Sequence, residues 1–203
     1  MRTQLLRSVL AIAVFALAGC QSQSKYMTRS PAAAPVQQPG KALVVFMRPS
    51  SFGGAIQASV YDTNPAEDKF VGIVSAGTKL AYAAEPGDHL FMVIAENADF
   101  MIAHLDAGKT YYVDVRARPG WWKARFSLLP IHNDATAKYN VQSQEFGKWQ
   151  AKTQWVGEKP QARQWFLEHK AAIREKKLDY LKKWNAMSAA DKAVLTLHAG
   201  DGT

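Results

Sequence analysis

Alternation of apolar and polar side chains between residues 41 and 131 constrains the fold of this chain more than any other feature. Eight short segments with this pattern follow one another, separated by turn sequences such as Glu85-Pro86-Gly87-Asp88 and Asp106-Ala107-Gly108-Lys109. A strand turns successive side chains to opposite faces, so the alternation predicts half-buried strands. Turns at intervals of roughly 8–12 residues, without a helical interruption, are typical of an antiparallel sandwich or barrel of about eight strands.

The segment from His89 to Glu96 is apolar on both faces, which favours a central position in its sheet. A domain spanning residues 41–131 is long enough to bury a core of its own. We therefore expect a mainly β fold. The expected strands cover residues 41–48, 56–62, 69–74, 78–83, 89–96, 100–105, 110–118 and 121–131.

The N-terminus has the features of a secretory signal. Arg2 and Arg7 precede an apolar run of ten residues, Val9–Ala18. A membrane-spanning helix needs ~20 apolar residues, so this run is too short to span a bilayer and fits the apolar core of a signal peptide. The run ends in Leu17-Ala18-Gly19-Cys20, and Cys20 is the single cysteine of the chain.

This ending resembles the lipobox of bacterial lipoproteins. The resemblance implies that residues 1–19 are removed, that Cys20 becomes the lipid attachment site, and that several acyl groups anchor the protein firmly in a membrane. Residues 21 and 22 are Gln and Ser rather than Asp, which resembles lipoproteins sorted to the outer membrane, facing the periplasm. The alternative is a secreted protein with a chance cysteine after its signal.

Residues 20–40 are expected to form a flexible linker behind the lipidated cysteine, because prolines and polar residues there leave little to bury. A single cysteine excludes a disulfide within the chain. The net charge is +8, which favours attraction of the protein to an anionic envelope surface. No aromatic and basic recognition signature is present, so we expect no nucleic-acid partner.

Two motifs carry a second resemblance. The turn Pro86-Gly87-Asp88-His89 and the strand Gly108-Lys109-Thr110-Tyr111-Tyr112 resemble a family of bacterial lipoprotein domains of unknown function. Their cadence is similar to that of PEGA and carboxypeptidase-regulatory-like domains. The resemblance covers residues 41–131 and implies an immunoglobulin-like β-sandwich with no known activity.

Residues 132–203 are expected to form a helical extension that packs on the sandwich. Pro160 suits the first turn of a helix over residues 160–187, and Ser188 is a suitable N-cap for a shorter helix reaching about His198. Residues 135–157 remain ambiguous. The long helix has one apolar stripe, formed by Phe166, Ile173, Tyr180, Leu181 and Trp184.

No catalytic motif is recognisable, and we expect no cofactor, metal or catalytic residue. His104 and Asp106 would share one strand face, but two ligands do not make a metal site. Asp88-His89 is interpreted as turn chemistry. The best rival site would join four residues from neighbouring strands, His89, His104, Asp106 and Asp114.

Three further features have both a structural and a functional interpretation. Phe52-Gly53-Gly54 is expected to be a mobile loop, with an anion cradle as the alternative. Trp121 and Trp122 point to opposite strand faces, so one needs a second surface, which is the helical extension, a ligand or a partner. The basic helix residues form a solvated face or a membrane or partner surface; they are Arg174, Lys176, Lys177, Lys182 and Lys183.

Two functions therefore remain. The expected one is a non-catalytic cell-envelope lipoprotein whose sandwich scaffolds or binds an envelope partner. The alternative is a small periplasmic hydrolase or carbohydrate-processing enzyme with an unrecognised site. A cleft with converging carboxylates and a raised pKa would favour the enzyme.

Overall fold

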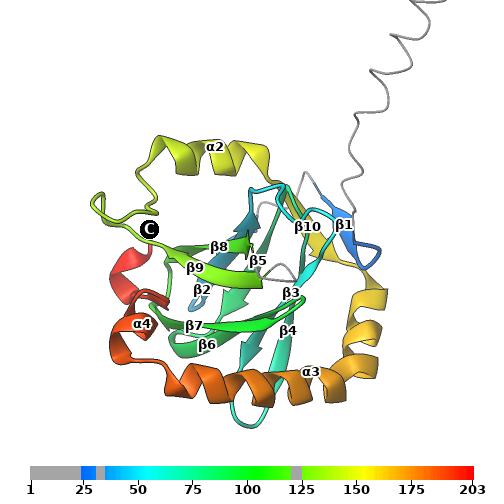
Figure 1. The fold of residues 1–203 in the computed structure, drawn as a ribbon. Coiled ribbons are helices and arrows are strands. Elements are labelled where there is room, and N and C mark those ends of the chain that lie inside the picture. Colours follow the sequence, from blue (N-terminus) through cyan, green and yellow to red (C-terminus); the bar gives the residue numbers. More distant parts are fainter. Residues whose placement is uncertain (1–23, 31–34, 120–124) are drawn as a thin grey trace, which may run out of the picture.

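The fold is mainly β, as the alternation predicts. The computed structural model describes residues 24–30, 35–119 and 125–203. Within these ranges the chain forms eleven strands, three α-helices and one 3-10 helix. Figure 1 shows two sheets stacked between helices, with α2 above and α3 below.

The strands divide between two sheets. The six-stranded sheet has the order β1-β10-β5-β2-β8-β9 and the five-stranded sheet the order β11-β7-β6-β3-β4. The strand bounds are β1 Met27–Arg29, β2 Ala42–Arg48, β3 Ala58–Thr63, β4 Asp68–Val74, β5 Thr78–Ala84, β6 Gly87–Ile94, β7 Ala98–Leu105, β8 Thr110–Arg118, β9 Arg125–Ile131, β10 Gln154–Glu158 and β11 Thr196–Leu197.

The main core lies between the two sheets. Phe46 on β2 meets Phe91 on β6 edge to face, with ring centroids 5.2 Å apart. Both rings are fully buried, as are Val44, Val113 and Val115. These side chains occupy every second position of their strands, so the period-two pattern is the physical origin of the two-layer core.

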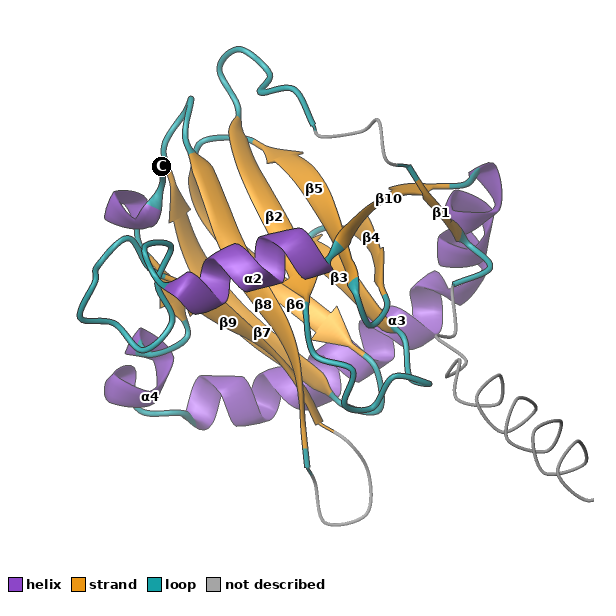
Figure 2. Ribbon diagram, turned by 90° about the horizontal axis from the view of Figure 1, so that it is seen from above, coloured by secondary structure: helices purple, strands orange, loops and turns teal. Residues whose placement is uncertain are grey.

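A helix covers each outer face, which makes four layers. Helix α2, Gln144–Lys152, begins at the N-cap Ser143 and lies across the six-stranded sheet (Figure 2). Its Trp149 joins a second apolar cluster on that face. Side chains of β2 and β9 complete this cluster, namely Leu43, Val45, Met47 and Ile131.

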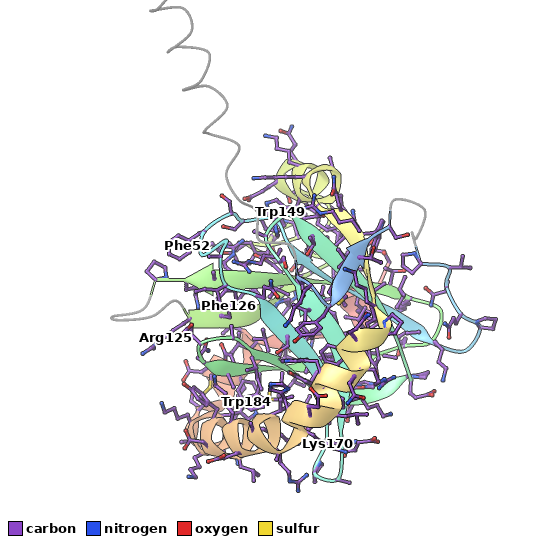
Figure 3. All side chains as sticks on the ribbon, turned by 90° about the vertical axis from the view of Figure 1, so that its right-hand side faces the viewer. Phe52, Arg125, Phe126, Trp149, Lys170 and Trp184 are labelled. Carbon is purple, nitrogen blue, oxygen red and sulfur yellow. The ribbon has the colours of Figure 1, made fainter. Side chains whose placement is uncertain are left out.

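Helix α3, Pro160–Ala186, covers the outer face of the five-stranded sheet. Phe166 stacks on Phe70 of β4 with ring centroids 5.5 Å apart, and Trp184 packs on Phe100 of β7 at 5.8 Å. Figure 3 shows Trp184 and Trp149 on opposite sides of the two sheets. The apolar stripe of the helix therefore packs against the sheet.

The expectation of a purely antiparallel sandwich of about eight strands is wrong in two respects. β2 pairs with β8 in parallel, and so do β10 with β5 and β11 with β7. Apolar alternation indicates which face of a strand is buried, but not which strand lies beside it or in which direction. The second error is the number of strands. The three additional ones, β1, β10 and β11, are all short, and each is defined mainly by the strand it pairs with.

Segments outside residues 41–131 contribute to both sheets. β1 lies within the expected linker of residues 20–40, where Met27 is buried and pairs with Glu158 of β10. The helix after Ser188, α4, spans only Ala189–Ala193. The chain then forms β11 rather than continuing as a helix to His198, because β7 offers an edge to pair with. The sheets therefore extend beyond the boundary expected at residue 131.

Residues 24–30, 35–119 and 125–203 contain no helix that is both long enough and apolar enough to cross a membrane.

Candidate functional site

A pocket of about 730 Å³ lies where the two sheets meet the C-terminal half of α3 and helix α4. We call it the β7–β9 groove, because β7 and β9 form its walls. β9 is the last strand of the six-stranded sheet, and its Pro130 is compatible with an edge position. β11 pairs with β7 only at Ile102 and Ala103, so the preceding part of β7 also borders the groove.

Asn97 joins the two sheets beside this groove. Its amide nitrogen donates to the carbonyl oxygen of Phe126 over 3.0 Å, and its side-chain oxygen accepts from the Phe126 amide at 2.6 Å. A side-chain amide can satisfy both backbone groups of one residue because it carries a donor and an acceptor. The pair fixes the spacing between β7 and β9.

The floor of the groove is apolar. Trp184 and Phe100 are buried, and Leu129, Met187 and Leu195 are half-buried. Val194 stands at the groove with 69% of its surface exposed. Pockets of a few hundred Å³ with an apolar floor and a few polar groups are typical of small-molecule binding sites.

Basic side chains dominate the charged lining of the groove. Four exposed cations belong to it, namely Arg118, Arg125, Lys138 and Lys183. The neighbouring end of β9 with Arg125 is visible in Figure 3. In the described part of the chain, no ion pair involves Arg125, Lys138 or Lys183.

The two carboxylates of the groove are engaged within the fold. Asp99 accepts hydrogen bonds from the Ser127 hydroxyl and, at 3.0 Å, from the Phe100 amide. Burial raises its pKa, against the opposing effect of these hydrogen bonds. Asp191 accepts from the hydroxyl of Ser188, the N-cap of α4, at 2.7 Å. With four cations and two carboxylates in its lining, the groove carries a net positive charge.

No family model matches this chain, and no curated protein matches it. The chemistry of the site rests on its own side chains. Cys20, the predicted lipid attachment site, lies outside the described residues, and so do Trp121 and Trp122.

His89, from the Pro-Gly-x-His turn, lies in a polar cluster between the sheets. Its Nδ1 is 3.0 Å from both carboxylate oxygens of Asp62, and its Nε2 is 2.8 Å from the carbonyl oxygen of Glu85. Both partners only accept hydrogen bonds, so the doubly protonated form of the ring satisfies both of them. The hydrogen bond to Asp62 raises the pKa of His89 although burial opposes it. Gly87 turns the chain at φ 121°, a value that favours glycine.

The four residues of the expected rival site are not brought together. His104 lies on β7 with its Nδ1 2.6 Å from Asp88, whereas Asp106 accepts from Lys109 at 2.8 Å. His89 is between the sheets. Asp114 faces the other side of the six-stranded sheet, towards α2.

Three histidines instead form a row that no sequence pattern predicts. The ring centroid of His198 is 6.3 Å from that of His104 and 6.3 Å from that of His132. His132 also bonds Asp201, with its Nδ1 3.0 Å from Oδ2. No three His, Cys, Asp or Glu residues among those described are placed to hold a metal ion. His132 and His198 have no metal-type spacing in sequence, so only the fold could reveal the row.

The Gly-Lys-x-Tyr-Tyr motif binds the C-terminal segment. Lys109 and Tyr111 both donate to the carbonyl oxygen of Ala199, at 3.0 and 3.2 Å. Tyr111 also accepts from the Asp106 amide at 2.8 Å. Tyr112 points to the other face and meets Phe146 of α2 edge to face, with centroids 4.9 Å apart. The motif therefore organises packing on both sides of β8.

The loop at Phe52-Gly53-Gly54 surrounds a buried arginine. Arg48 donates to the carbonyl oxygens of Ile56, Phe52 and Gly53, at 2.5, 3.1 and 2.7 Å. Its guanidinium lies over the ring of Phe126, 4.7 Å from the centroid. Burial lowers the pKa of Arg48 to about 10. The loop turns carbonyl oxygens towards a cation of its own chain, which is the opposite of an anion cradle.

Asp114 lies under α2 and is almost fully buried. Its Oδ2 is 2.6 Å from Arg116, whose guanidinium stacks on Tyr139 at 4.3 Å. Burial raises the pKa of Asp114 to about 6, while Arg116 acts to lower it. Arg116 and Tyr139 close over the carboxylate, so it is a buried structural ion pair.

The five cations of the expected basic face do not share one role. Arg174 and Lys182 are exposed, but Lys177 is buried and lies 2.6 Å from Asp68. Lys176 donates to the carbonyl oxygens of Ala95 and Glu96. Lys183 lies at the β7–β9 groove. A uniformly solvated face is therefore wrong for Lys177, which fixes α3 to the sheet.

Proposed function

We propose that this protein is a non-catalytic lipoprotein of the bacterial cell envelope. A lipid on Cys20 anchors it in the outer membrane, from which it faces the periplasm. Its two-sheet body binds or scaffolds an envelope partner, and it needs no cofactor or metal. The order of the N-terminal signals supports the anchor: two arginines, an apolar run, two small residues and then the single cysteine.

One observation carries the non-catalytic part of the proposal: the side chains of the two motifs, His89, Lys109 and Tyr111, are already engaged within the fold. His89 is the best general-base candidate, and both of its ring nitrogens face acceptors of the protein itself. A general base needs a free lone pair within reach of a substrate proton. Lys109 and Tyr111 are likewise bonded to the backbone of Ala199.

The relation to immunoglobulin-like sandwiches is part of the same proposal. Two sheets packed around a core of alternating side chains support it. The parallel pairing of β2 with β8 departs from that pattern, so the relation stays a prediction.

Labelling with a fatty acid tests the anchor. We expect the wild-type chain to incorporate labelled palmitate and the Cys20→Ser variant to incorporate none. Gln21→Asp is the matched control, because it keeps the thiol and should keep the label while moving the protein to the inner-membrane fraction. Label on the Cys20→Ser variant would contradict the proposed anchor.

A screen for activity tests the rest. The Cys20→Ser chain is assayed for metal content and for turnover of generic ester, phosphate and glycoside substrates. We expect no stoichiometric metal and no turnover. Turnover that disappears in His89→Gln or His104→Ala would overturn the non-catalytic assignment and favour a periplasmic hydrolase.

A further inference from the structure

The β7–β9 groove combines two kinds of surface, an apolar floor and a basic rim. Its floor offers the apolar side chains of Phe100, Leu129 and Trp184, and Val194 stands exposed beside them. An exposed valine next to an apolar hollow keeps apolar surface in contact with water. Covering this surface with a ligand of matching character lowers the free energy through the hydrophobic effect.

The polar lining selects the sign of the ligand's charge. Arg125, Lys138 and Lys183 have no carboxylate partner among the described residues. Asp99 is paired with Arg118 at 3.5 Å and Asp191 is exposed, so the four cations of the lining outnumber its two carboxylates. A carboxylate or phosphate group is the complement of such a set of cations.

The aliphatic stems of these cations also matter. Lys and Arg side chains can lie with their methylene groups along apolar surface and their charge at the solvent boundary. A ligand with an apolar body and an anionic end would meet the floor and the rim together. A free anion would lack the apolar contacts, and a neutral hydrocarbon would leave the cations unpaired.

We propose that the β7–β9 groove binds an anionic amphiphile, a molecule with an apolar chain and a carboxylate or phosphate head. The inference deepens the proposed function and rests on its binding role, but it does not depend on the lipid anchor. A groove of about 730 Å³ is within the ~300–1,000 Å³ typical of pockets for small organic ligands.

The test is a displacement assay on the full chain carrying Cys20→Ser, purified without detergent. The fluorescent probe is 1-anilinonaphthalene-8-sulfonate, itself an aromatic anion. We expect dodecanoate and dodecyl phosphate to displace it below their micellar concentrations. Acetate and inorganic phosphate, which have the head alone, and dodecyltrimethylammonium, which has the opposite charge, should displace little. The two dodecyl anions compared with each other distinguish a carboxylate from a phosphate ligand.

Matched variants place the binding at this groove. Lys183→Ala should weaken dodecanoate binding by about tenfold, the effect of losing one charge-assisted hydrogen bond, whereas Lys182→Ala, one residue away and outside the lining, should not change it. Val194→Asp, just after α4, should also weaken binding, and its control is Leu178→Asp, at an exposed apolar residue of α3 outside the groove. All four sites are exposed, so melting temperatures should stay close to wild type.

Equal displacement by dodecyltrimethylammonium and dodecanoate would overturn the charge selection. Equal affinities for Lys183→Ala and Lys182→Ala would place the binding elsewhere and overturn the groove. If no dodecyl compound binds, the inference as a whole is overturned. Palmitate labelling at Cys20 would still test the anchor separately.

Discussion

The hydroxyl of Tyr82, on the six-stranded sheet, donates a 2.8 Å hydrogen bond to Asp62, on the five-stranded sheet. The bond crosses the space between the sheets, where most contacts are apolar. Burial and the neighbouring Asp62 both raise the pKa of Tyr82, so it remains a protonated donor at neutral pH. With His89 on the other side of Asp62, the three side chains tie β5, β3 and β6 together.

Removing the Tyr82 hydroxyl should weaken this connection. Tyr82→Phe keeps the ring and should lower the free energy of unfolding by about 1 kcal/mol, the net value of a typical intramolecular hydrogen bond. Urea denaturation measures the change. Tyr180→Phe is the control, since this half-buried tyrosine lies on α3, away from Asp62, and its stability should match that of the wild type.

The raised pKa of His89 predicts a specific pH dependence. Its ordinary value is 6.5 and the folded value is higher, so the folded state binds the proton more tightly than the unfolded state. The stabilisation is complete below about pH 6.5 and is lost as the pH rises through the folded pKa. We expect the free energy of unfolding to fall as the pH rises above about 6.5 and through the raised pKa of His89, and His89→Gln should flatten that slope. An unchanged slope in the variant would mean that another group titrates.

Asp114 gives a second pH effect, localised under α2. Its folded pKa of about 6 lies above its ordinary 3.8, so its contribution is also lost as the pH rises through the folded value. Arg116→Met removes the countercharge and should raise the pKa of Asp114 further. The melting temperature should therefore drop more at pH 8 than at pH 5. Arg174→Met, on the exposed side of α3, should lower neither value.

The buried pair of Lys177 and Asp68 predicts a large loss when one partner is removed. Lys177→Ala leaves the Asp68 carboxylate buried and without its cation, which typically costs about 3–5 kcal/mol. Lys170→Ala, at an exposed site of the same helix, should be neutral (Figure 3). The double variant Lys177→Met, Asp68→Asn should recover much of the loss, because no charge is then buried. A double variant no more stable than Lys177→Ala would argue against the charge as the cause.

Docking of α3 depends on its aromatic residues. Trp184 is buried against Phe100 and lines the groove, and large-to-alanine changes at buried aromatic sites cost about 3–5 kcal/mol. Trp184→Ala should therefore lower the melting temperature clearly. Lys182→Ala, two positions earlier and exposed, is the matched control. An unchanged melting temperature of Trp184→Ala would contradict this packing role.

The sequence predicts the parts of the fold that depend on local patterns. β2, β8 and α3 lie within one residue of their expected bounds, because alternation, turn residues and Pro160 mark them directly. β11 has two residues and is defined by the edge of β7, so no local pattern could reveal it. The candidate site was missed for the same reason: Arg125, Lys138 and Lys183 are far apart in sequence, and only the return of the tail to the sheets brings them to one groove.

The parallel pairing of β2 with β8 sets an order on the folding of the chain. Leu43 to Met47 align with Thr110 to Asp114, and five other strands separate the two segments in sequence. The centre of the six-stranded sheet therefore closes a long loop, and such non-local pairings make folding slow, on the scale of milliseconds to seconds. Until β8 pairs with it, β2 has one unpaired edge. The side chains on both of its faces, which are buried in the folded protein, are then still uncovered. The interval before this closure is therefore the period in which the unfolded chain is at greatest risk of aggregation through the open edge of β2.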